Sequence, residues 1–533
     1  MHRLFVLAAL LGAAIIGQQP SEPARADQPE KSHAAAVEVL FNEAADGLCI
    51  CVPFAEPIDK TSSKQMILDG YRKLIERYSG TGITHLLLNT NYQRACYPSK
   101  AWDSYWDIDG PEANLNGWPR TMWRIHQAGV DPYAVCIELC RDHGISPWTS
   151  MRMNDTHYLQ DPHKPNRFWK EHPEYRTSPG AGFNFAIEAV RRHHLALIEE
   201  ILQRYDVDGL ELDWMRGYPD FPGGGSGEEG QVLTRFMRKV DRLAVQASQR
   251  RGHSVKIAAR VPAVPQVAHA LGLHGDAWVR EGLVDTLIVS STWMPADRDT
   301  PLETWRDLIG SIEHDYKLAA SMGLWVRCVP GGPLMRNDLE SARGFTTSMI
   351  DRGADQIYMF NHFNPKDFLC EVELSDGSTS QIDIFRQLVT ESAHFDMAMA
   401  SPRRHILTHH DTAAPGISNP RPLPAGLEKG ETGAFRIYSG PKPRTGSVVI
   451  RVGLDESDDL WQAKLTARLN SVECPSIEDL NQPGEYVPHD GKGFHYAWSV
   501  AQVAPRVAQF NVPLAAVEGG YNRVELTLRD GAK

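Results

Sequence analysis

Between residues 46 and 395, short apolar runs take turns with segments in which apolar residues recur at helical spacing. This pattern predicts a repeated order of strand and helix. The clearest helix is the stretch 186–204, in which apolar residues recur every three or four positions. It leads directly into the short run 207–213, in which Val207, Leu210 and Leu212 are apolar and which has the length of a buried strand that ends in carboxylates. Eight such repeats predict an α/β fold, a (β/α)8 TIM barrel with long loops.

The predicted elements are spaced as this fold requires. We place the eight strands at 47–54, 83–91, 145–155, 207–213, 256–261, 284–293, 324–329 and 355–361. We place helices at 63–78, 131–143, 186–204, 236–250, 302–322 and 339–352. A doubly wound open sheet is the alternative, but no G-x-G-x-x-G motif or phosphate-binding loop follows the first strand.

The composition and the pattern of the sequence change after residue 399, so we end the barrel segment, 46–399, at this residue. Residues 400–431 are rich in Pro, Gly and His and predict a linker. From 432 to 533 short strands alternate with turns, which predicts a C-terminal all-β sandwich similar to jelly-roll modules. Such a domain has either a carbohydrate-binding or a purely structural role.

The first 26 residues have the pattern of a signal peptide. Arg3 precedes the apolar stretch 4–17, and Ala24-Arg25-Ala26 provides a small-x-small cleavage site. We therefore expect an exported protein, secreted or periplasmic, in which residues 27–45 form a polar lead-in. An uncleaved anchor is the alternative, and no later apolar run is long enough to span a membrane.

Composition narrows the function classes. The formal net charge of -12 and the lack of a basic stripe argue against nucleic acid as a partner. The 8 cysteines lack the spacing of a structural zinc site, so we expect no metal there, and no cofactor is implied.

The run YDVDGLELDWMR at 205–216 carries the strongest chemical signal. Strand alternation places Glu211 and Asp213 on one face, and Leu210 and Leu212 on the other. Burying an unpaired carboxylate is costly, and two carboxylates about 7 Å apart are a setting for perturbed pKa values and acid–base chemistry. The alternative is a pair of structural acids satisfied by backbone and arginine partners.

Barrels of this type have their active sites at the C-terminal ends of the strands. The residues predicted there are Asn89, Asn91, Trp148, Arg152, Asn154, Asp155, Glu211, Asp213, Arg216, Arg260, Trp293, Asp297, Arg327, Asn361 and His362. Among them, tryptophans can stack on sugar rings and amides can bind hydroxyls. The arginines can orient carboxylates or bind an anionic group such as a uronate or sulfate.

This set favours glycoside hydrolysis, which needs two carboxyl groups about 5 Å apart for retention or about 6.5–9.5 Å apart for inversion. Asp213 is the predicted nucleophile or base, because it stands last on its strand and faces inward. Glu211, Asp155 and Asp297 are the candidates for the acid, and the sequence does not choose among them. His362 is an acid, a hydrogen-bond donor or a loop residue.

The run 205–214 and the run Ser150-Met-Arg-Met-Asn-Asp155 resemble the corresponding strands of the family 10-like glycosyl hydrolases, which are bacterial barrel proteins. The resemblance covers residues 46 to 395. It implies that Asp213 carries chemistry, with Glu211, Arg152 and Asn154 nearby.

The run 208–215 is also similar to the family 18 chitinase pattern Asp-Gly-x-Asp-x-Asp-x-Glu. The chain has Glu211 at the middle Asp and Met215 at the final Glu, the catalytic acid of that family. Methionine cannot donate a proton, so we do not expect the chitinase mechanism. We expect a glycoside hydrolase that acts on a polysaccharide, either neutral or anionic. The alternatives are a non-catalytic glycan-binding protein and an enzyme acting on another bond.

Overall fold

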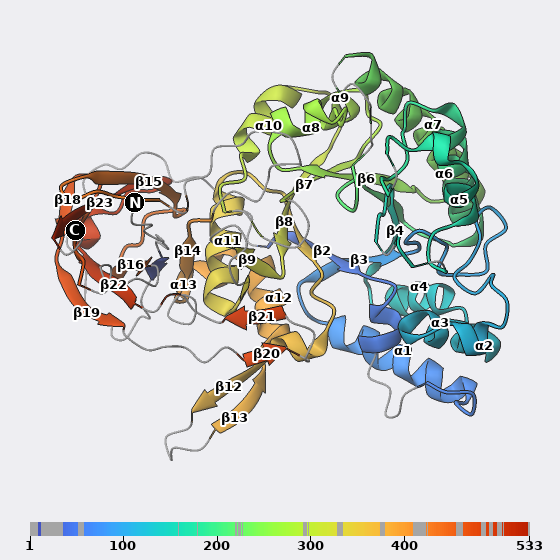
Figure 1. Cartoon of the computed structure of the whole chain (residues 1–533), viewed down its shortest axis with the longest axis horizontal. Helices are drawn as coiled ribbons and strands as arrows, with labels where there is room; N and C mark the ends of the chain where they lie inside the picture. The colour runs from blue at the N-terminus through green and yellow to red at the C-terminus, as the bar shows by residue number, and fades with distance from the viewer. Residues whose placement is uncertain are drawn as a thin grey trace.

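The computed structural model describes residues 9–11, 36–51, 58–157, 159–161, 163–178, 180–218, 221, 225, 227–291, 296, 298–327, 334–373, 379–408, 423, 425–454, 462–480, 487–489, 494–497, 504 and 506–530. A barrel with its helices lies on the right of Figure 1, and antiparallel sheets of the C-terminal region lie on the left. Of the predicted signal peptide, the structure describes only β1 (Ala9–Leu11), which pairs with β14 (Arg404–Ile406). The cleavage of this segment stays a prediction.

Eight strands close into a barrel in the order β11-β2-β3-β4-β5-β6-β7-β8, and every neighbouring pair is parallel. The strands are β2 (Glu38–Glu43), β3 (Ile83–Asn89), β4 (Ser146–Arg152), β5 (Gly209–Asp213), β6 (Lys256–Pro262), β7 (Thr286–Ser290), β8 (Lys317–Gly323) and β11 (Gln356–Phe360). This closed parallel barrel and the antiparallel sheets confirm the predicted fold class.

Helices surround the barrel, as Figure 1 shows. The larger ones are α1 (Lys64–Tyr78), α3 (Gly117–Gln127), α4 (Pro132–Asp142), α6 (Glu188–Arg204), α7 (Glu228–Arg251), α10 (Leu302–Ile309), α11 (Leu339–Asp351) and α12 (Phe385–Ala393). Shorter helices are α2 (Pro111–Asn114), α5 (Arg167–Glu171), α8 (Pro265–Ala270), α9 (Gly275–Arg280) and α13 (Phe395–Ala400).

The strand β5 is buried along its whole length, and its two faces meet different surroundings. Leu210 and Leu212 belong to the large apolar core between the strands and the helices. Glu211 and Asp213 face the barrel interior, where Glu211 meets the side chains of β2 and β11. The predicted alternation is therefore confirmed, and both carboxyl groups stand inside the barrel.

The barrel interior around and below these carboxyl groups contains buried apolar side chains from seven strands. They are Leu40, Leu87, Trp148, Ala258, Ile288, Ala319, Tyr358 and Phe360. The largest of them, Trp148, fits because Gly209 stands opposite it on the next strand. A Cβ at Gly209 would lie 2.4 Å from ring atoms of Trp148.

Two predicted strands of the barrel are wrong. The segment predicted as the first strand begins with a π-helical turn (Gly47–Cys51), and the first barrel strand is β2, just before it. The segment 317–323, predicted as the end of a helix, is β8, the seventh strand. Its alanines and leucine have high helix propensity, but a strand buried on both faces also reads as a continuous apolar run.

Arg327 was consequently placed on the wrong element. It belongs to β9 (Trp325–Arg327), which pairs with β10 (Leu334–Arg336) outside the barrel. That sheet has the order β20-β21-β10-β9, with β20 (Val487–His489) and β21 (Phe494–Ala497) from the C-terminal region. A hairpin of β12 (Leu369–Glu373) and β13 (Thr379–Asp383) projects at the bottom of Figure 1.

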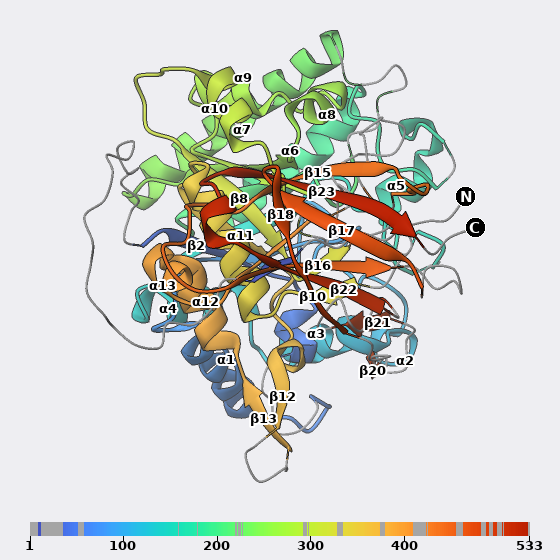
Figure 2. The same ribbon diagram turned by 90° about the vertical axis from the view of Figure 1, so that its left-hand side faces the viewer.

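The C-terminal region contains two antiparallel sheets, which face the viewer in Figure 2. One has the order β15-β23-β17-β18, with β15 (Thr432–Tyr438), β23 (Tyr521–Asp530), β17 (Lys464–Leu469) and β18 (Val472–Cys474). The other has the order β16-β22-β19, with β16 (Val448–Leu454), β22 (Arg506–Val512) and β19 (Ser476–Leu480). Apolar side chains of both sheets share one core, as in a β-sandwich.

Asp299 ties the sandwich to the barrel. Its carboxylate accepts hydrogen bonds from Tyr521 Oη at 2.6 Å and from Arg436 Nε at 2.9 Å, both in the sandwich. Arg352, which follows α11, donates to the same carboxylate at 3.1 Å. The side chain of Asp299 is only 13% exposed and that of Arg352 is 2% exposed, so this ion pair is shielded from water, whereas Arg436 is largely exposed.

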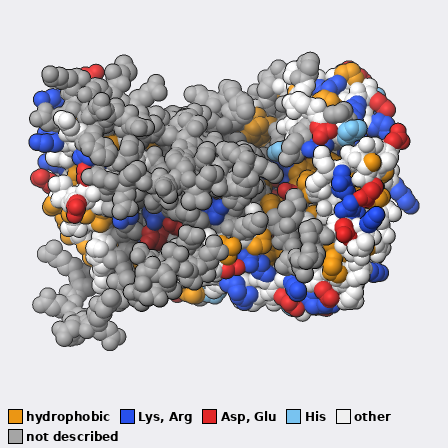
Figure 3. Space-filling model, turned by 60° about the horizontal axis from the view of Figure 1, so that its bottom comes forward, with side chains coloured by type: hydrophobic (Ala, Val, Ile, Leu, Met, Phe, Trp, Pro, Cys, Tyr) orange, Lys and Arg blue, Asp and Glu red, His pale blue; other side chains and the backbone are white. Residues whose placement is uncertain are grey.

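Acidic and basic side chains are interspersed on the described barrel part of the face drawn in Figure 3. That part of the face therefore presents no large patch of one charge. Among the described residues, no helix has both the length and the apolar character needed to cross a membrane.

Candidate functional site

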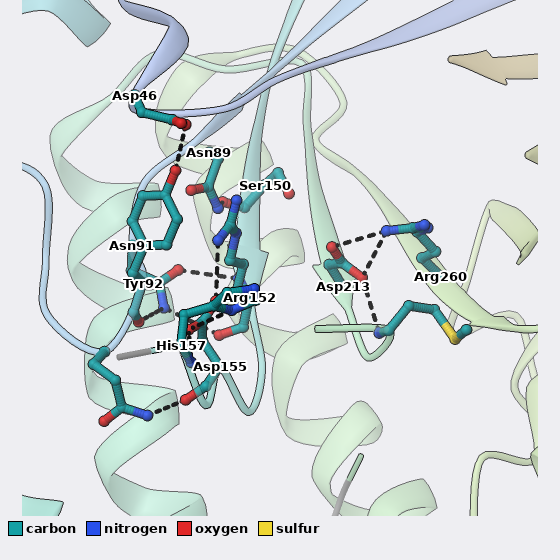
Figure 4. A network of polar contacts seen from close by, with 12 residues as sticks. Asp46, Asn89, Asn91, Tyr92, Ser150, Arg152, Asp155, His157, Asp213 and Arg260 are labelled. Carbon is teal, nitrogen blue, oxygen red and sulfur yellow. Dashed lines mark hydrogen bonds and ion pairs between the residues drawn. The ribbon is translucent and has the colours of Figure 1, made fainter. Parts of the chain in front are cut away.

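Asp213 is held at the C-terminal end of β5 by the neighbouring strand. Arg260, its partner in the register of β6, donates from Nη1 to both carboxylate oxygens at 3.3 and 3.2 Å. The backbone N–H of Met215 donates to Oδ1 of Asp213 at 2.9 Å. Figure 4 shows both contacts converging on this carboxylate. Donors from two directions hold the carboxylate of Asp213 in one orientation.

Arg260 is itself fixed on its remaining sides. Its Nε and Nη2 donate to Ser290 Oγ at 3.1 and 2.9 Å. The guanidinium carbon lies 3.7 Å from the ring centroid of Phe360, in the range of a cation–π contact. The side chain is fully buried, so its position is set by these contacts and not by solvent.

Glu211 lies one layer deeper than Asp213 and is fully buried. Tyr358 Oη donates to its Oε1 at 2.7 Å, and Asn42 Nδ2 donates to its Oε2 at 3.4 Å. Burial raises the pKa of Glu211 to about 7, the negative charge of Asp213 adds to this, and hydrogen bonds from Ser150 and Tyr358 oppose it. Near neutral pH, Glu211 therefore exchanges a proton while Arg260 neutralises Asp213.

Asp155 is held by a second arginine. Arg152 Nη1 donates to its Oδ2 at 3.0 Å, and the backbone N–H of His157 donates to its Oδ1 at 2.8 Å. Burial alone would raise the pKa of Asp155, but the contacts with His157 and the charge of Arg152 outweigh it and hold the pKa well below its usual range. An acid that is ionised at neutral pH has no proton to give, so the geometry argues against Asp155 as the catalytic acid.

Asp46 is a carboxylate at the mouth that the sequence reasoning missed. It follows β2 and is half-buried, and Tyr92 Oη donates to its Oδ1 at 2.5 Å. The ring of Tyr92 lies under Arg152, 3.8 Å from the guanidinium carbon. Figure 4 shows Asp46, Tyr92 and Arg152 in one group beside Asn89. Correct placement of the first strand would have revealed Asp46, because it stands three residues beyond the end of β2.

Two of the predicted binding amides brace loops instead. Asn91 donates from Nδ2 to the carbonyl of Arg152 at 3.0 Å and accepts from the N–H of Arg152 at 3.0 Å. Asn154 donates to the carbonyl of Phe183 at 3.1 Å and accepts from its N–H at 2.7 Å. Their amide groups are used by the backbone, which favours a structural role for both residues over substrate binding.

Trp148 also has a different place from the predicted one. It is 2% exposed and lies in the apolar layer of the barrel, at the level of Gly209 and below Glu211. No ring face of Trp148 can therefore stack on a sugar. Trp293 and Asp297 lie outside the described residues, and the side chain of Arg327 is likewise not described.

Several polar atoms at the strand ends are buried without a hydrogen-bond partner among the described residues. They are Asn89 Oδ1, Asn361 Oδ1, His362 Nε2 and both Nε and Nη1 of Arg216. Buried polar atoms are nearly always paired, so such a group of exceptions needs an explanation. These residues follow or end β3, β5 and β11, at the mouth where a ligand would supply the missing partners.

The backbone at the end of β11 supports this interpretation. Asn361 has a φ of 61°, in the left-handed region that few residues other than glycine adopt. His362 Nδ1 lies 3.0 Å from the carbonyl of Phe360, so Nδ1 carries the proton and Nε2 is an acceptor. Burial lowers the pKa of His362 to about 3. The ring is therefore neutral and a poor acid at neutral pH.

One group of side chains among the described residues has donor atoms close enough together for a metal ion, namely His269, His274 and Asp276. It lies on and beside α8 and α9, outside the barrel. Asp276 already binds His269 Nε2 at 2.7 Å and Arg280 Nη2 at 2.9 Å. The arginine supplies the positive charge a metal would bring, so this group is an ion-pair network.

No family model matches the chain, and no curated protein matches it. Among solved structures, it is similar to alpha-L-fucosidase isoenzyme 1 from Paenibacillus thiaminolyticus, at 11% identity over 93% of this chain and 97% of that one, with a TM-score of 0.32. The catalytic domain of GH30 xylanase C from Talaromyces cellulolyticus has 11% identity over 94% and 98% of the two chains and a TM-score of 0.34. A GH138 enzyme targeting pectin rhamnogalacturonan II has 11% identity over 70% and 40%, with a TM-score of 0.40. Similarities of this size carry no argument about activity.

Proposed function

We propose that the protein is a glycoside hydrolase and that Asp213 is its nucleophile or base. The observation that carries this proposal is the inward-facing pair Glu211 and Asp213 at the end of β5, with Asp213 oriented by Arg260 and Met215. The amide oxygens of Asn89 and Asn361 have no partner within the described part of the chain, and this supports a ligand with many hydroxyl groups, since each oxygen can accept from one.

The chemistry requires a second carboxyl group across the mouth from Asp213, because one group must protonate the leaving oxygen. Asp46 is our candidate for this role among the described residues, since it is a partly exposed carboxyl group beyond the end of β2. Asp297, predicted from the sequence, remains a candidate outside the described residues. Glu211 lies beneath Asp213, and in this proposal its protonation sets the total negative charge of the two carboxyl groups. Its pKa of about 7 means that a fraction of the molecules carries the proton on Glu211 at neutral pH.

The substrate in this proposal is a polysaccharide that carries acidic groups, uronate or sulfate. One buried arginine at the mouth, Arg216, has donors that no described residue uses, and arginine is the side chain best suited to bind such groups. The N-terminal pattern around Arg3 and Ala24-Arg25-Ala26 supports export, which would bring the enzyme to a polymer outside the cell.

A non-catalytic glycan-binding protein is the second candidate. Met215 favours it, because methionine stands where a chitinase-like strand would carry its acid. The ion pair of Asp155 with Arg152 favours it too, since it removes one predicted acid from use.

The test is the release of reducing ends from matched neutral, uronic and sulfated glycans by four proteins. We expect Asp213→Asn and Asp46→Asn each to lower release by about 10²- to 10⁴-fold, the range of a lost acid or base. Asp206→Asn is the control, because Asp206 is an exposed acid before the opposite end of β5. Binding of one glycan without release by the wild type would establish the second candidate instead. Full activity in Asp213→Asn would exclude the proposed mechanism.

A further inference from the structure

Arg216 stands out among the buried side chains at the mouth. It follows Asp213 by three residues and is 8% exposed. Its guanidinium carbon lies 4.9 Å from the ring centroid of Phe360, which also carries Arg260. The side chain is therefore held at the mouth of the barrel, against the same ring as the arginine that orients Asp213.

Two donors of Arg216 are left unused by the described residues, in contrast to those of its neighbours. Arg260 pairs with Asp213 and Arg152 pairs with Asp155. Nε and Nη1 of Arg216 are buried and meet no acceptor among the described residues. A buried cation without a hydrogen-bonded partner is costly, and structures retain such a group where a ligand completes it.

The electrostatics show what kind of ligand would do so. Burial lowers the pKa of Arg216 to about 10, and the positive charge of Arg152 adds to this effect. The negative charges of Asp213 and Asp155 raise the pKa of Arg216. Both carboxylates therefore interact with Arg216 electrostatically, although neither is hydrogen-bonded to it. A sugar hydroxyl could accept one hydrogen bond and would leave the charge uncompensated. An oxyanion would satisfy several donors and the charge together.

We propose that Arg216 is an anion-binding residue of the site, and that its ligand is the carboxylate of a uronic acid or the sulfate ester of a sugar bound next to Asp213. This inference rests on the glycoside hydrolase function proposed above, and it assigns the acidic group of the substrate to one side chain. Arg216 touches the substrate and takes no part in the transfer of protons.

The experiment measures the binding of sodium glucuronate, sodium sulfate and glucose to the full-length protein by calorimetry at constant ionic strength. The variants are Arg216→Met, which keeps the apolar stem over Phe360, and Arg216→Lys, which keeps the charge. Arg77→Met is the matched control, because Arg77 also lies over a phenylalanine, 4.3 Å from the ring centroid of Phe385, on a surface helix. A thermal melt of each variant checks that it is folded.

We expect glucuronate or sulfate to bind the wild type and Arg77→Met, and to bind Arg216→Met about 10- to 100-fold more weakly. The anion that binds more tightly identifies the source of the charge, a uronate or a sulfate ester. Arg216→Lys should retain part of the affinity, because a point charge replaces a planar fork. Glucose should bind the wild type and Arg216→Met alike.

Two results would overturn the assignment: no binding of either anion to the wild type, or equal binding to the wild type and Arg216→Met. The underlying function fails in a different way. If the anion binds through Arg216 but no glycan is hydrolysed, the subsite stands and the hydrolase does not. If neutral glycans are hydrolysed at the same rate by the wild type and Arg216→Met, and neither anion binds, the hydrolase stands and the subsite does not.

Discussion

Arg260 Nη1 lies 3.2 Å from Asp213 Oδ2, and the two side chains are 0% and 2% exposed. They occupy paired positions in the register of β6 and β5. A buried ion pair gains little over apolar residues of the same size, but removal of one partner leaves a buried charge with no compensation. The barrel therefore depends on both charges together, and the orientation of Asp213 depends on Arg260.

This relationship predicts a coupled effect on stability. Arg260→Met should lower the free energy of unfolding by about 3–5 kcal/mol, because it leaves Asp213 charged and buried. Asp213→Asn should also be destabilising, because it leaves Arg260 unpaired. The double variant should lose less than the sum of the two single losses. Urea unfolding of the four proteins measures this coupling. Additive losses would mean that the pair contributes no interaction energy.

The second prediction concerns the pH dependence of the proposed hydrolysis. The pKa of Glu211 is raised to about 7, so below pH 7 the pair with Asp213 carries one negative charge. Above pH 7 Glu211 ionises and the two carboxylates repel each other. We expect kcat/KM to fall as the pH rises through about 7 in the wild type, and this fall to disappear in Glu211→Gln, whose side chain stays neutral.

Tyr358→Phe provides an independent check on this assignment. The hydrogen bond from Tyr358 lowers the pKa of Glu211, so its loss should move the fall in kcat/KM to higher pH. Tyr71→Phe is a suitable control, because Tyr71 donates to the carbonyl of Leu48 and lies outside the barrel interior. A fall at the same pH in Tyr358→Phe and the wild type would assign the titration to another group.

Part of this arrangement could be predicted from the sequence. The period of two placed Glu211 and Asp213 on one face, because alternation depends only on local backbone geometry. The repeated order of strand and helix predicted a closed barrel, because the strand and helix periods also depend on local backbone geometry. Whether an amide braces a loop or faces a ligand could not be predicted, since Asn154 is satisfied by Phe183, from a loop far along the chain.

The errors at the first and seventh strands have a common physical cause. Parallel barrel strands are buried on both faces and carry no alternation, so a short apolar run fits a strand, a helix or an irregular turn equally well. The run Gly47–Cys51 is apolar and forms a π-helical turn, whereas Glu38–Glu43 has charged ends and is a barrel strand. Asn42 and Asp46 were missed at the site for this reason.

The third prediction concerns a buried acid outside the barrel interior. Glu43 is fully buried, and Tyr78 Oη donates to its Oε2 at 2.5 Å while Oε1 has no partner among the described residues. Burial raises the pKa of Glu43 from 4.5 to about 8; the hydrogen bond from Tyr78 opposes this, and the charge of Asp46 adds to it. Between these two pH values the folded protein keeps a proton that the unfolded chain has lost.

The free energy of unfolding should therefore fall as the pH rises from 4.5 to 8. The contribution of Glu43 over this window is at most about 5 kcal/mol. Glu43→Gln cannot ionise and should flatten the slope, whereas Glu38→Gln, at the start of the same strand, should leave it unchanged. Urea unfolding at several pH values measures both slopes. Equal slopes in Glu43→Gln and the wild type would mean that Glu43 ionises normally.

The last prediction concerns the packing beneath the site. A Cβ at Gly209 would lie 2.4 Å from ring atoms of Trp148, far inside van der Waals contact, and the ring is enclosed by the barrel. Gly209→Ala should therefore lower the free energy of unfolding by about 1–3 kcal/mol, the usual range for overpacking. Gly519→Ala is the control, since its nearest atom would be 3.5 Å away. Trp148→Leu should open space for the added methyl group, so the double variant should lose less than the two single variants together.

Because Trp148 is core and touches no ligand in this arrangement, Trp148→Leu should change stability and leave glycan affinity within about twofold once the protein is folded. A large loss of affinity in a stable Trp148→Leu variant would place this ring at the binding surface.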